Sequence, residues 1–554
     1  MDREEFEHLK PEEQEKIFHH IPFKERGELF FCAHEPARLT QSLSPEELYL
    51  LTREMDLEER SEVIRHANLP QLFFISDIEC WKKDRLSSKG FLQWLETLHE
   101  AGDDKLLAWL REMDYETVVS GLKELIRVLR PETEYPTDEV LGDEPFFTLD
   151  ERYFILVKEE NIELVRRAVE ILFENHHGRY TALLEGVLGE LDDELEEEAY
   201  QKRETRLAER GFPNAEIAHQ IYRPLSKEEF GEFPRKNTSP KKAREEPAFN
   251  SKPPDYLVLW SAERLFLDDV LLLFREDSGE SREGLQEELA WLSNKVIACQ
   301  GIDFASEEKV RRGIERARRT VSIGLEDLSG RDLGRAQEFM RERWLEIIFR
   351  WGVSRLMELR EGARQTLKTH WRGERESFLE FLDEPYHFIF RGLFLRPLPE
   401  CFDPEVKDDP YFLRDFKNLE EVEKARRAVL QMDQIHEFLA REFPGSLREE
   451  SAALFSLLGN LFASFAAGGK ISSGPISEKT TLTFIKKGFE PAGPRRILNR
   501  GLKEEFLNRF FSNQDQEVLK TLWALVFQRL EEELGGLDPS KGIDPRFVSS
   551  IRTA

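Results

Sequence analysis

The sequence predicts an all-α protein with an N-terminal, irregular helical-repeat (superhelical) domain followed by a C-terminal helical domain. Three observations predict this fold class. A helix–turn–helix unit recurs near the N-terminus, capping residues precede stretches with apolar side chains at helical spacing, and 40% of the residues are hydrophobic, enough to build cores. Because 554 residues exceed the size of one ordinary core, we expect at least two domains.

The repeated unit spans residues 43–66, and related patterns occur at 9–32 and 104–123. Within residues 43–66, apolar side chains fall at positions i, i+3 and i+7 of one helix, and a second short helix follows. One helix pair cannot bury its apolar face alone, so neighbouring pairs should stack. Trp81, Trp94 and Trp109 are expected in this core rather than in a binding stripe.

Capping residues define where the repeat helices begin. Ser44 is suited to the N-cap, Pro45 to the first helical position, and Glu47 completes a capping box. Asp56 and Asp114 precede the second helix of their units. We therefore interpret both aspartates as helix caps and not as catalytic carboxylates.

The chain divides by composition into a helical-repeat domain (1–222), a flexible Pro- and Lys-rich linker (223–255) and a C-terminal helical domain (256–554). The linker contains six prolines and shows no helical periodicity. Three further helices are predicted at 425–443, 452–467 and 516–534, and the one at 452–467 is expected to be buried. A capping box predicts a helix through 153–157. The tail after Gly536 is expected to be frayed.

The net charge of −29 argues against a general binder of nucleic-acid phosphates and against docking on anionic lipid. No apolar run reaches the ~20 residues needed to span a bilayer, and the acidic N-terminus does not resemble a signal peptide. The four cysteines are scattered and form no CxxC pair, which suits a reducing compartment. We expect a soluble cytoplasmic protein.

Catalytic motifs are absent from the sequence: it contains no P-loop, GxSxG elbow, HExxH pair or GxGxxG fingerprint. The sequence thus assigns no catalytic, cofactor-binding or metal-ligating residue, and an enzyme is less expected than a binding protein. Pairs of Glu-x-x-His (in one case Asp-x-x-His) are nevertheless frequent, and carboxylate-bridged metal sites in helical bundles use this spacing. The pairs are Glu5/His8, Glu96/His99, Glu174/His177, Glu216/His219, Glu384/His387 and Asp433/His436.

Parts of the first half resemble two known groups of proteins. The Leu-x-x-Leu and Glu-Met-Asp units within 43–129 look like the N-terminal helical repeats of MgtE-type magnesium transporters. That transporter's transmembrane helices and CBS domains are not recognisable here, so the resemblance implies no magnesium role. Residues 43–49, 77–86 and 106–114 resemble an uncharacterised bacterial family of long acidic helical proteins, which implies no activity.

These observations favour a non-enzymatic cytoplasmic helical-repeat scaffold or adaptor that binds a partner protein. An acidic helical surface suits a basic partner. The alternative is a helical-bundle metal-binding protein or metalloenzyme that uses the Glu-x-x-His pairs, with Glu174, His177, Glu216 and His219 as the best set. Nucleic-acid binding through the basic segment 309–375 is less expected than pairing of that segment with acidic residues of the chain.

Overall fold

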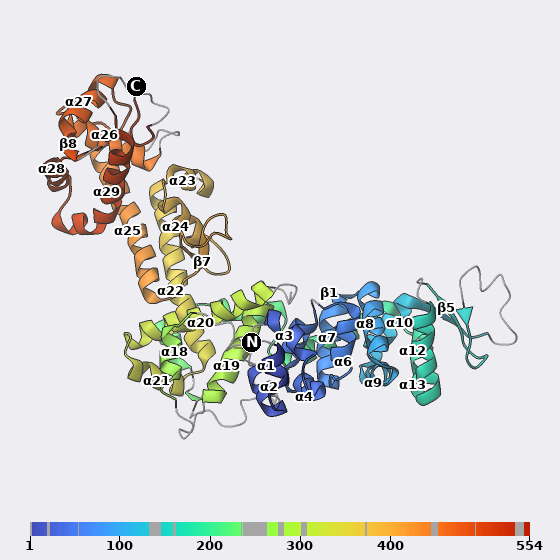
Figure 1. Cartoon of the computed structure of the whole chain (residues 1–554). Coiled ribbons are helices and arrows are strands. Elements are labelled where there is room, and N and C mark those ends of the chain that lie inside the picture. Colours follow the sequence, from blue (N-terminus) through green and yellow to red (C-terminus); the bar gives the residue numbers. More distant parts are fainter. Residues whose placement is uncertain are drawn as a thin grey trace. The chain divides into compact units, whose positions relative to one another are not determined.

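The computed structural model describes residues 3–18, 21, 23–53, 55–131, 146–158, 162–233, 235–236, 263–274, 282–300, 307–371, 374–444, 453–492, 495–537 and 548–553. Helices dominate these residues, and the strands form only small two- and three-stranded sheets (Figure 1). The prediction of a mainly α-helical protein is therefore confirmed. The superhelical arrangement of the repeats stays a prediction. None of the described helices is both long and apolar enough to cross a membrane.

The chain forms two compact units. The first comprises Met1–Ile221, Phe233–Arg318 and Leu333–Phe349, and the second comprises Tyr222–Glu232, Arg319–Asp332 and Arg350–Ala554. The predicted boundaries 1–222, 223–255 and 256–554 stay a prediction, because most of the predicted linker lies outside the described residues. The described start of that linker contains α16 (Lys227–Glu232), and just before it the Leu225 N–H donates to the buried Ser354 Oγ at 2.7 Å.

The first unit begins with short helices that follow one another with brief turns, and neighbours such as α6 and α8 pack together (Figure 1). Its elements are α1 (Arg3–Glu7), α2 (Pro11–Phe18), α3 (Phe23–Phe30), α4 (Pro36–Ser42), α5 (Pro45–Thr52), α6 (Leu57–Ile64), α7 (Leu69–Glu79), β1 (Trp81–Lys82), β2 (Arg85–Leu86), α8 (Ser88–Ala101), α9 (Asp103–Glu112), α10 (Tyr115–Leu125), β3 (Ile126–Leu129), β4 (Phe146–Phe147), β5 (Phe154–Val157), α12 (Ile162–Asn175), α13 (His177–Gly189), α14 (Asp192–Ala208), α15 (Ala215–His219), α18 (Phe266–Leu271), α19 (Arg282–Ala298) and α21 (Leu333–Glu342).

The predicted capping of the central repeat is confirmed. The Ser44 hydroxyl accepts from the Glu47 N–H at 3.2 Å, and the Glu47 carboxylate accepts from the Ser44 N–H at 3.0 Å. Asp56 accepts from the Glu59 N–H at 2.9 Å. These bonds satisfy N–H groups that a helix start otherwise leaves without partners, so both helices of the unit begin where the sequence predicts.

The cap predicted at Asp114 is wrong. Asp114 occupies the N-cap position of α10, but its side chain makes no capping hydrogen bond. It forms an ion pair with Arg206 of α14 instead. A guanidinium offers a charge-assisted bond, which is stronger than the bond from a backbone amide, and the sequence gives no sign that α14 will pack here.

Corresponding positions of two repeats also share an ion pair that ties one helix to a later one. Arg60 of α6 lies 2.6 Å from Glu79 of α7, and the equivalent Arg26 of α3 lies 3.5 Å from Glu47 of α5. Arg26 and Glu47 are both fully buried, and Arg26 also donates to the Ile21 carbonyl at 2.9 Å. The repeat is therefore held by polar contacts inside its core as well as by the buried apolar residues, which include Trp94 and Trp81 as predicted.

Within 153–157, Phe154–Val157 form a strand, so the predicted helix is wrong. The Thr148 hydroxyl does accept from the Glu151 N–H at 3.0 Å, as the start of a helix would require. Glu151 then adopts a positive φ of 56°, which turns the chain away from a helical path. The following Phe-Ile-Leu-Val run is wholly buried as β5, at the centre of a sheet with strand order β3-β5-β4.

The second unit is also helical, with two short antiparallel strand pairs, β6–β7 and β8–β9. Its elements besides α16 are η4 (Leu367–Trp371), α23 (Arg375–Phe381), α24 (Tyr386–Leu393), β6 (Glu400–Phe402), β7 (Leu413–Asp415), α25 (Leu419–Glu442), α26 (Leu454–Ala466), α27 (Glu478–Gly488), β8 (Phe489–Ala492), β9 (Arg495–Leu498), α28 (Arg500–Phe510) and α29 (Asn513–Leu534). Two further helices, α20 (Glu307–Ser329) and α22 (Leu345–Thr366), contribute residues to both units.

Three helix predictions in the second unit are confirmed with small shifts of their ends, as α25, α26 and α29. Almost every residue of α26 is buried, as predicted for a central helix. The frayed tail is wrong for residues 548–553, because Val548 and Ile551 are buried and the Ile476 N–H donates to the Arg552 carbonyl at 2.8 Å. Residues 538–547 lie outside the described part of the chain.

Gly352→Ala should destabilise the second unit by ~1–3 kcal/mol, because an added Cβ would overlap the backbone carbonyl oxygen of Thr320 on the facing helix. Gly362→Ala on the same helix is the matched control. Its Cβ would meet only the Val429 side chain, at 3.8 Å, so alanine should be neutral or stabilise by up to about 1 kcal/mol through helix propensity. Urea unfolding of both variants checks the difference, and equal stabilities would contradict close packing at Gly352.

Candidate functional site

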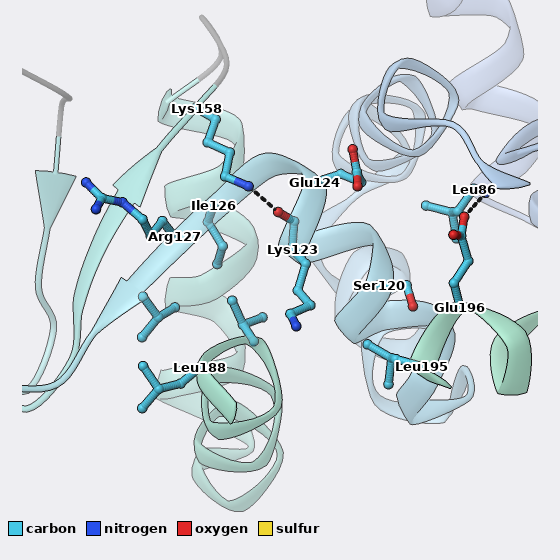
Figure 2. Close-up of a pocket in the computed structure, with 12 residues that line it drawn as sticks. Leu86, Ser120, Lys123, Glu124, Ile126, Arg127, Lys158, Leu188, Leu195 and Glu196 are labelled. Atoms are coloured by element: carbon cyan, nitrogen blue, oxygen red, sulfur yellow. Dashed lines mark hydrogen bonds between the residues drawn. The ribbon is translucent and has the colours of Figure 1, made fainter. Parts of the chain in front are cut away.

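A cleft of about 340 Å³ lies alongside β3 in the first unit (Figure 2). We call it the β3 cleft. Its walls come from β2, α10, β3, α13, α14 and the residue that follows β5. The volume falls at the lower end of the ~300–1,000 Å³ typical of ligand pockets. The lining residues are Leu86, Ser120, Lys123, Glu124, Ile126, Arg127, Val128, Lys158, Val187, Leu188, Leu195 and Glu196.

The cleft follows the open edge of strand β3. It touches three consecutive residues of the strand, 126–128, whose side chains alternate between the two faces of the sheet. A hollow that touches all three is bordered by the backbone of the strand and not by one face of its side chains alone. In the three-stranded sheet β3 is an outer strand, paired with β5 alone among the described strands.

The register of the sheet determines which backbone groups face the cleft. Ile126 lies opposite Val157, and the Lys158 N–H donates to the Leu125 carbonyl at 2.8 Å. Antiparallel pairs alternate between bonded and non-bonded, so Arg127 exchanges hydrogen bonds with β5. The backbone N–H and C=O of Val128 and the C=O of Ile126 therefore point away from β5, toward the cleft.

Apolar side chains line much of the cleft. Ile126, Val128 and Leu195 are buried, while Leu188 near the end of α13 is 38% exposed. Leu191, immediately beyond α13, is 67% exposed. Exposed leucines next to a hollow provide apolar surface that a bound molecule could cover.

Charged groups divide between two ends of the cleft (Figure 2). Lys123, Arg127 and Lys158 lie at the end formed by β3, where the Lys158 ammonium donates to the Lys123 carbonyl at 2.6 Å. Glu124 and Glu196 lie at the other end, and Glu196 accepts from the Leu86 N–H at 3.0 Å. In a chain with 80 Lys and Arg against 109 Asp and Glu, the β3 end is a local cationic site.

Ser120 provides independent support for a ligand. Its side chain lines the cleft and is only 8% exposed, and its hydroxyl finds no hydrogen-bond partner among the described residues. A hydroxyl buried without a partner costs about 1–3 kcal/mol, and most such groups in proteins are satisfied. A bound polar group would supply the missing bond.

A second hollow, of about 430 Å³, lies among α6, α7 and α8. Two of its charged groups, Arg60 and Glu79, form an ion pair at its wall, although the Arg60 Nε has no partner among the described residues. It borders no strand edge and contains no unpartnered buried hydroxyl among the described residues. The β3 cleft is therefore the better candidate.

The metal hypothesis gains no support from the described residues, where no group of three or more His, Cys, Asp and Glu could hold a metal ion. Glu174 is exposed and 4.0 Å from Arg167, and the His177 ring stacks on Tyr180. His219 on α15 contacts the Ala215 carbonyl at 2.6 Å through its ring nitrogen. The candidate set Glu174, His177, Glu216 and His219 is thus not brought together.

The basic segment 309–375 is largely engaged inside the protein, as the simpler expectation proposed. Arg318 pairs with Asp268 at 2.6 Å, Arg331 with Glu326 at 3.0 Å, and Arg355 with Glu358 at 2.5 Å. Arginines paired in this way are less available to neutralise phosphates.

Sequence reasoning did not find the β3 cleft. Its three cations, Lys123, Arg127 and Lys158, look like ordinary surface residues, and Lys158 joins the others only because β5 pairs with β3. Residues 77–86 contain the end of α7 and the β1–β2 hairpin, and Leu86 of β2 lines the cleft. Nothing in the sequence indicated the remaining contacts.

Comparison with known proteins gives one match. The model of DUF6178, described as a family of unknown function, matches residues 3–554. No curated protein and no solved structure matches the chain. The expected family resemblance thus extends over the whole chain rather than its first half, and the resemblance to MgtE-type repeats has no support.

Proposed function

The chain belongs to the DUF6178 family, whose description names no activity, and we propose from the β3 cleft that it is a scaffold or adaptor that binds a partner protein. The observation that supports this proposal is the combination of apolar walls with a strand edge and a buried Ser120 hydroxyl that both lack partners in the described part of the chain. Protein segments are recognised by backbone hydrogen bonds together with apolar pockets, and the cleft offers both.

The lining of the cleft favours binding over catalysis. Its twelve residues include no histidine, cysteine, aspartate or tyrosine, and the one possible hydroxyl nucleophile, Ser120, has no hydrogen-bond partner among the described residues that could act as its base. Its two glutamates lie at the end away from Arg127 and Lys158. We propose a cytoplasmic location because the four cysteines are free, as in proteins of reducing compartments.

The whole surface of this chain and its β3 cleft favour opposite charges on the partner. The net charge of −29 favours a partner whose contact surface is basic overall. The β3 end of the cleft is cationic, so the segment that enters there should differ in charge from the rest of the partner.

Site-specific photo-crosslinking in cells tests the scaffold proposal. A photoreactive phenylalanine replaces Leu188 in the cleft, and the matched control carries it at Leu333, which is also 38% exposed. We expect a discrete protein adduct at position 188 that is missing at position 333. If no adduct exceeds the control at several light doses, the cleft does not bind a protein and the proposal is wrong.

A further inference from the structure

We propose that the occupant of the β3 cleft is an extended peptide segment rich in acidic and apolar residues, which adds to β3 as a further strand of the sheet. This inference rests on the proposed partner-binding function and specifies its ligand. An edge strand that presents unpaired backbone groups is a template for pairing with another chain. Peptide recognition by strand addition uses those groups for affinity and neighbouring pockets for specificity.

The backbone of β3 is suited to this role. The N–H and C=O of Val128 and the C=O of Ile126 face the cleft, whereas Arg127 is bonded to β5. The two residues that carry these groups, Ile126 and Val128, lie two positions apart along the strand, which is the repeat at which a neighbouring strand makes its hydrogen bonds. A helix could not use them, because its own backbone groups are already bonded internally.

The side chains around the edge specify what the added strand should contain. Ile126 and Val128 of β3 are buried beside the cleft, and Val187, Leu188 and Leu195 of α13 and α14 add further apolar lining. Alternate side chains of an added strand would point toward this apolar surface, so every second residue should be aliphatic. The residues between them need to be compatible with the charged groups.

The charges select acidic residues at the β3 end. The Lys158 ammonium carries three donors, and the bond to the Lys123 carbonyl uses one of them. The Lys123 ammonium is itself held at 2.5 Å from the Glu190 carbonyl, so it keeps a fixed place beside β3. A carboxylate next to these ammonium groups gains charge-assisted bonds, whereas a basic residue would be repelled.

Fluorescence anisotropy with capped, labelled peptides on the full chain tests the inference. The probe alternates valine and glutamate over six residues, and its partner probe replaces glutamate by lysine. We expect saturable binding of the acidic probe, at least ~10-fold tighter than that of the basic probe. Absence of saturable binding by the acidic probe would overturn the inference.

N-methylated probes test the strand geometry. One probe is methylated on the valine nitrogens and the other on the glutamate nitrogens. Only one of these sets faces β3 in an added strand, so we expect one probe to lose binding and the other to keep it. Equal binding of the two would show that backbone pairing is not used.

Variants of the protein locate the binding. Val128→Pro removes the N–H that faces the cleft and leaves the β3–β5 hydrogen bonds intact, a change that edge strands tolerate. Lys158→Glu reverses a charge at the β3 end. Each should weaken the acidic probe by at least ~10-fold, whereas Lys89→Glu, an exposed control on α8, should not. If all three bind equally, the peptide binds elsewhere and the inference is wrong.

The outcomes separate this inference from the scaffold proposal. An adduct at Leu188 without probe binding would leave a partner protein in the cleft but exclude the acidic strand. If neither an adduct at Leu188 nor binding of the acidic probe is found, the scaffold proposal and the strand inference are both wrong. If the protein dimerises in sedimentation and probe binding falls as dimer forms, a second copy of the chain occupies the cleft, which also overturns the inference.

Discussion

Arg206→Met is expected to lower the free energy of unfolding of the first unit by ~3–5 kcal/mol, the loss typical when a buried ion pair is deprived of one partner. Arg206 contacts both carboxylate oxygens of Asp77, at 2.6 and 2.8 Å, and pairs with Asp114 as well. Asp77 on α7 is 1% exposed. Methionine keeps much of the apolar stem of arginine, so the loss reports the missing charge.

The pH dependence of this variant distinguishes lost charge from lost packing. Burial already raises the pKa of Asp77 above its usual value, although Arg206 opposes that shift. Without Arg206 the pKa should rise further. An aspartate whose pKa is higher in the folded state stabilises folding at low pH and loses that contribution as pH rises through the folded pKa. The deficit of Arg206→Met relative to wild type should therefore shrink as pH falls from 7 toward 5.

A double-mutant cycle provides the control. Asp77→Asn combined with Arg206→Met removes the unpaired charge, so it should recover a substantial part of the stability lost in Arg206→Met. The exposed pair Arg500–Glu504 on α28 is the external comparison, and Arg500→Met should change little. Urea titration with amide exchange of α7 and α14 measures these effects. A loss for Arg206→Met no larger than that for Arg500→Met would contradict the proposed role of the pair.

Local features of the fold were predictable where short-range physics decides. The capping box at Ser44 and Glu47 and the helices α25, α26 and α29 follow from cap residues and apolar periodicity, and the structure confirms them. These elements need only the nearby sequence. The burial of α26 was predictable too, because few of its residues are polar.

Predictions were wrong where a distant segment decides the outcome. The run at 153–157 has the composition of either a helix or a strand, and it became β5 because β3 and β4 offered backbone partners. Asp114 turned to Arg206, 92 positions later, rather than to its own helix. The β3 cleft has the same origin, since its lining comes from positions 86 to 196 and exists only once the sheet and α14 are in place.

Glu533→Gln is expected to release the C-terminal segment 548–553 from the second unit, at a cost of about 3 kcal/mol. The Glu533 carboxylate on α29 accepts four hydrogen bonds from two serines. The backbone N–H groups of Ser549 and Ser550 lie at 2.9 and 2.8 Å, and their hydroxyls both lie at 2.6 Å. A glutamine amide has one oxygen and an NH₂ group that donates, so it cannot accept all four bonds.

Gly459→Ala should release the same segment from its other side. Gly459 on α26 lies so close to the Ser550 carbonyl that an added Cβ would overlap the oxygen. Neighbouring Asn460 also accepts from the Arg552 N–H at 2.9 Å, so the segment bridges α26 and α29. Glu532→Gln is the matched control for Glu533→Gln, because Glu532 is exposed and, among the described residues, bonds only to Gln528 of its own helix, at 2.8 Å.

Amide exchange of Ser549 and Ser550 measures the release, and its pH dependence tests the cause. Burial raises the pKa of Glu533, but the bonds from Ser549 and Ser550 outweigh burial and bring the pKa below its ordinary value of 4.5. A lowered carboxyl pKa stabilises the docked state above pH 4.5, and this contribution disappears as pH falls through the folded pKa. After correction for intrinsic exchange rates, the two amides of wild type should therefore be protected at pH 7 and lose protection as the pH falls below 4.5. In Glu533→Gln the same amides should be unprotected both at pH 7 and below pH 4.5. Protection in Glu533→Gln equal to wild type at pH 7 would show that the apolar contacts of Val548 and Ile551 hold the segment without the carboxylate.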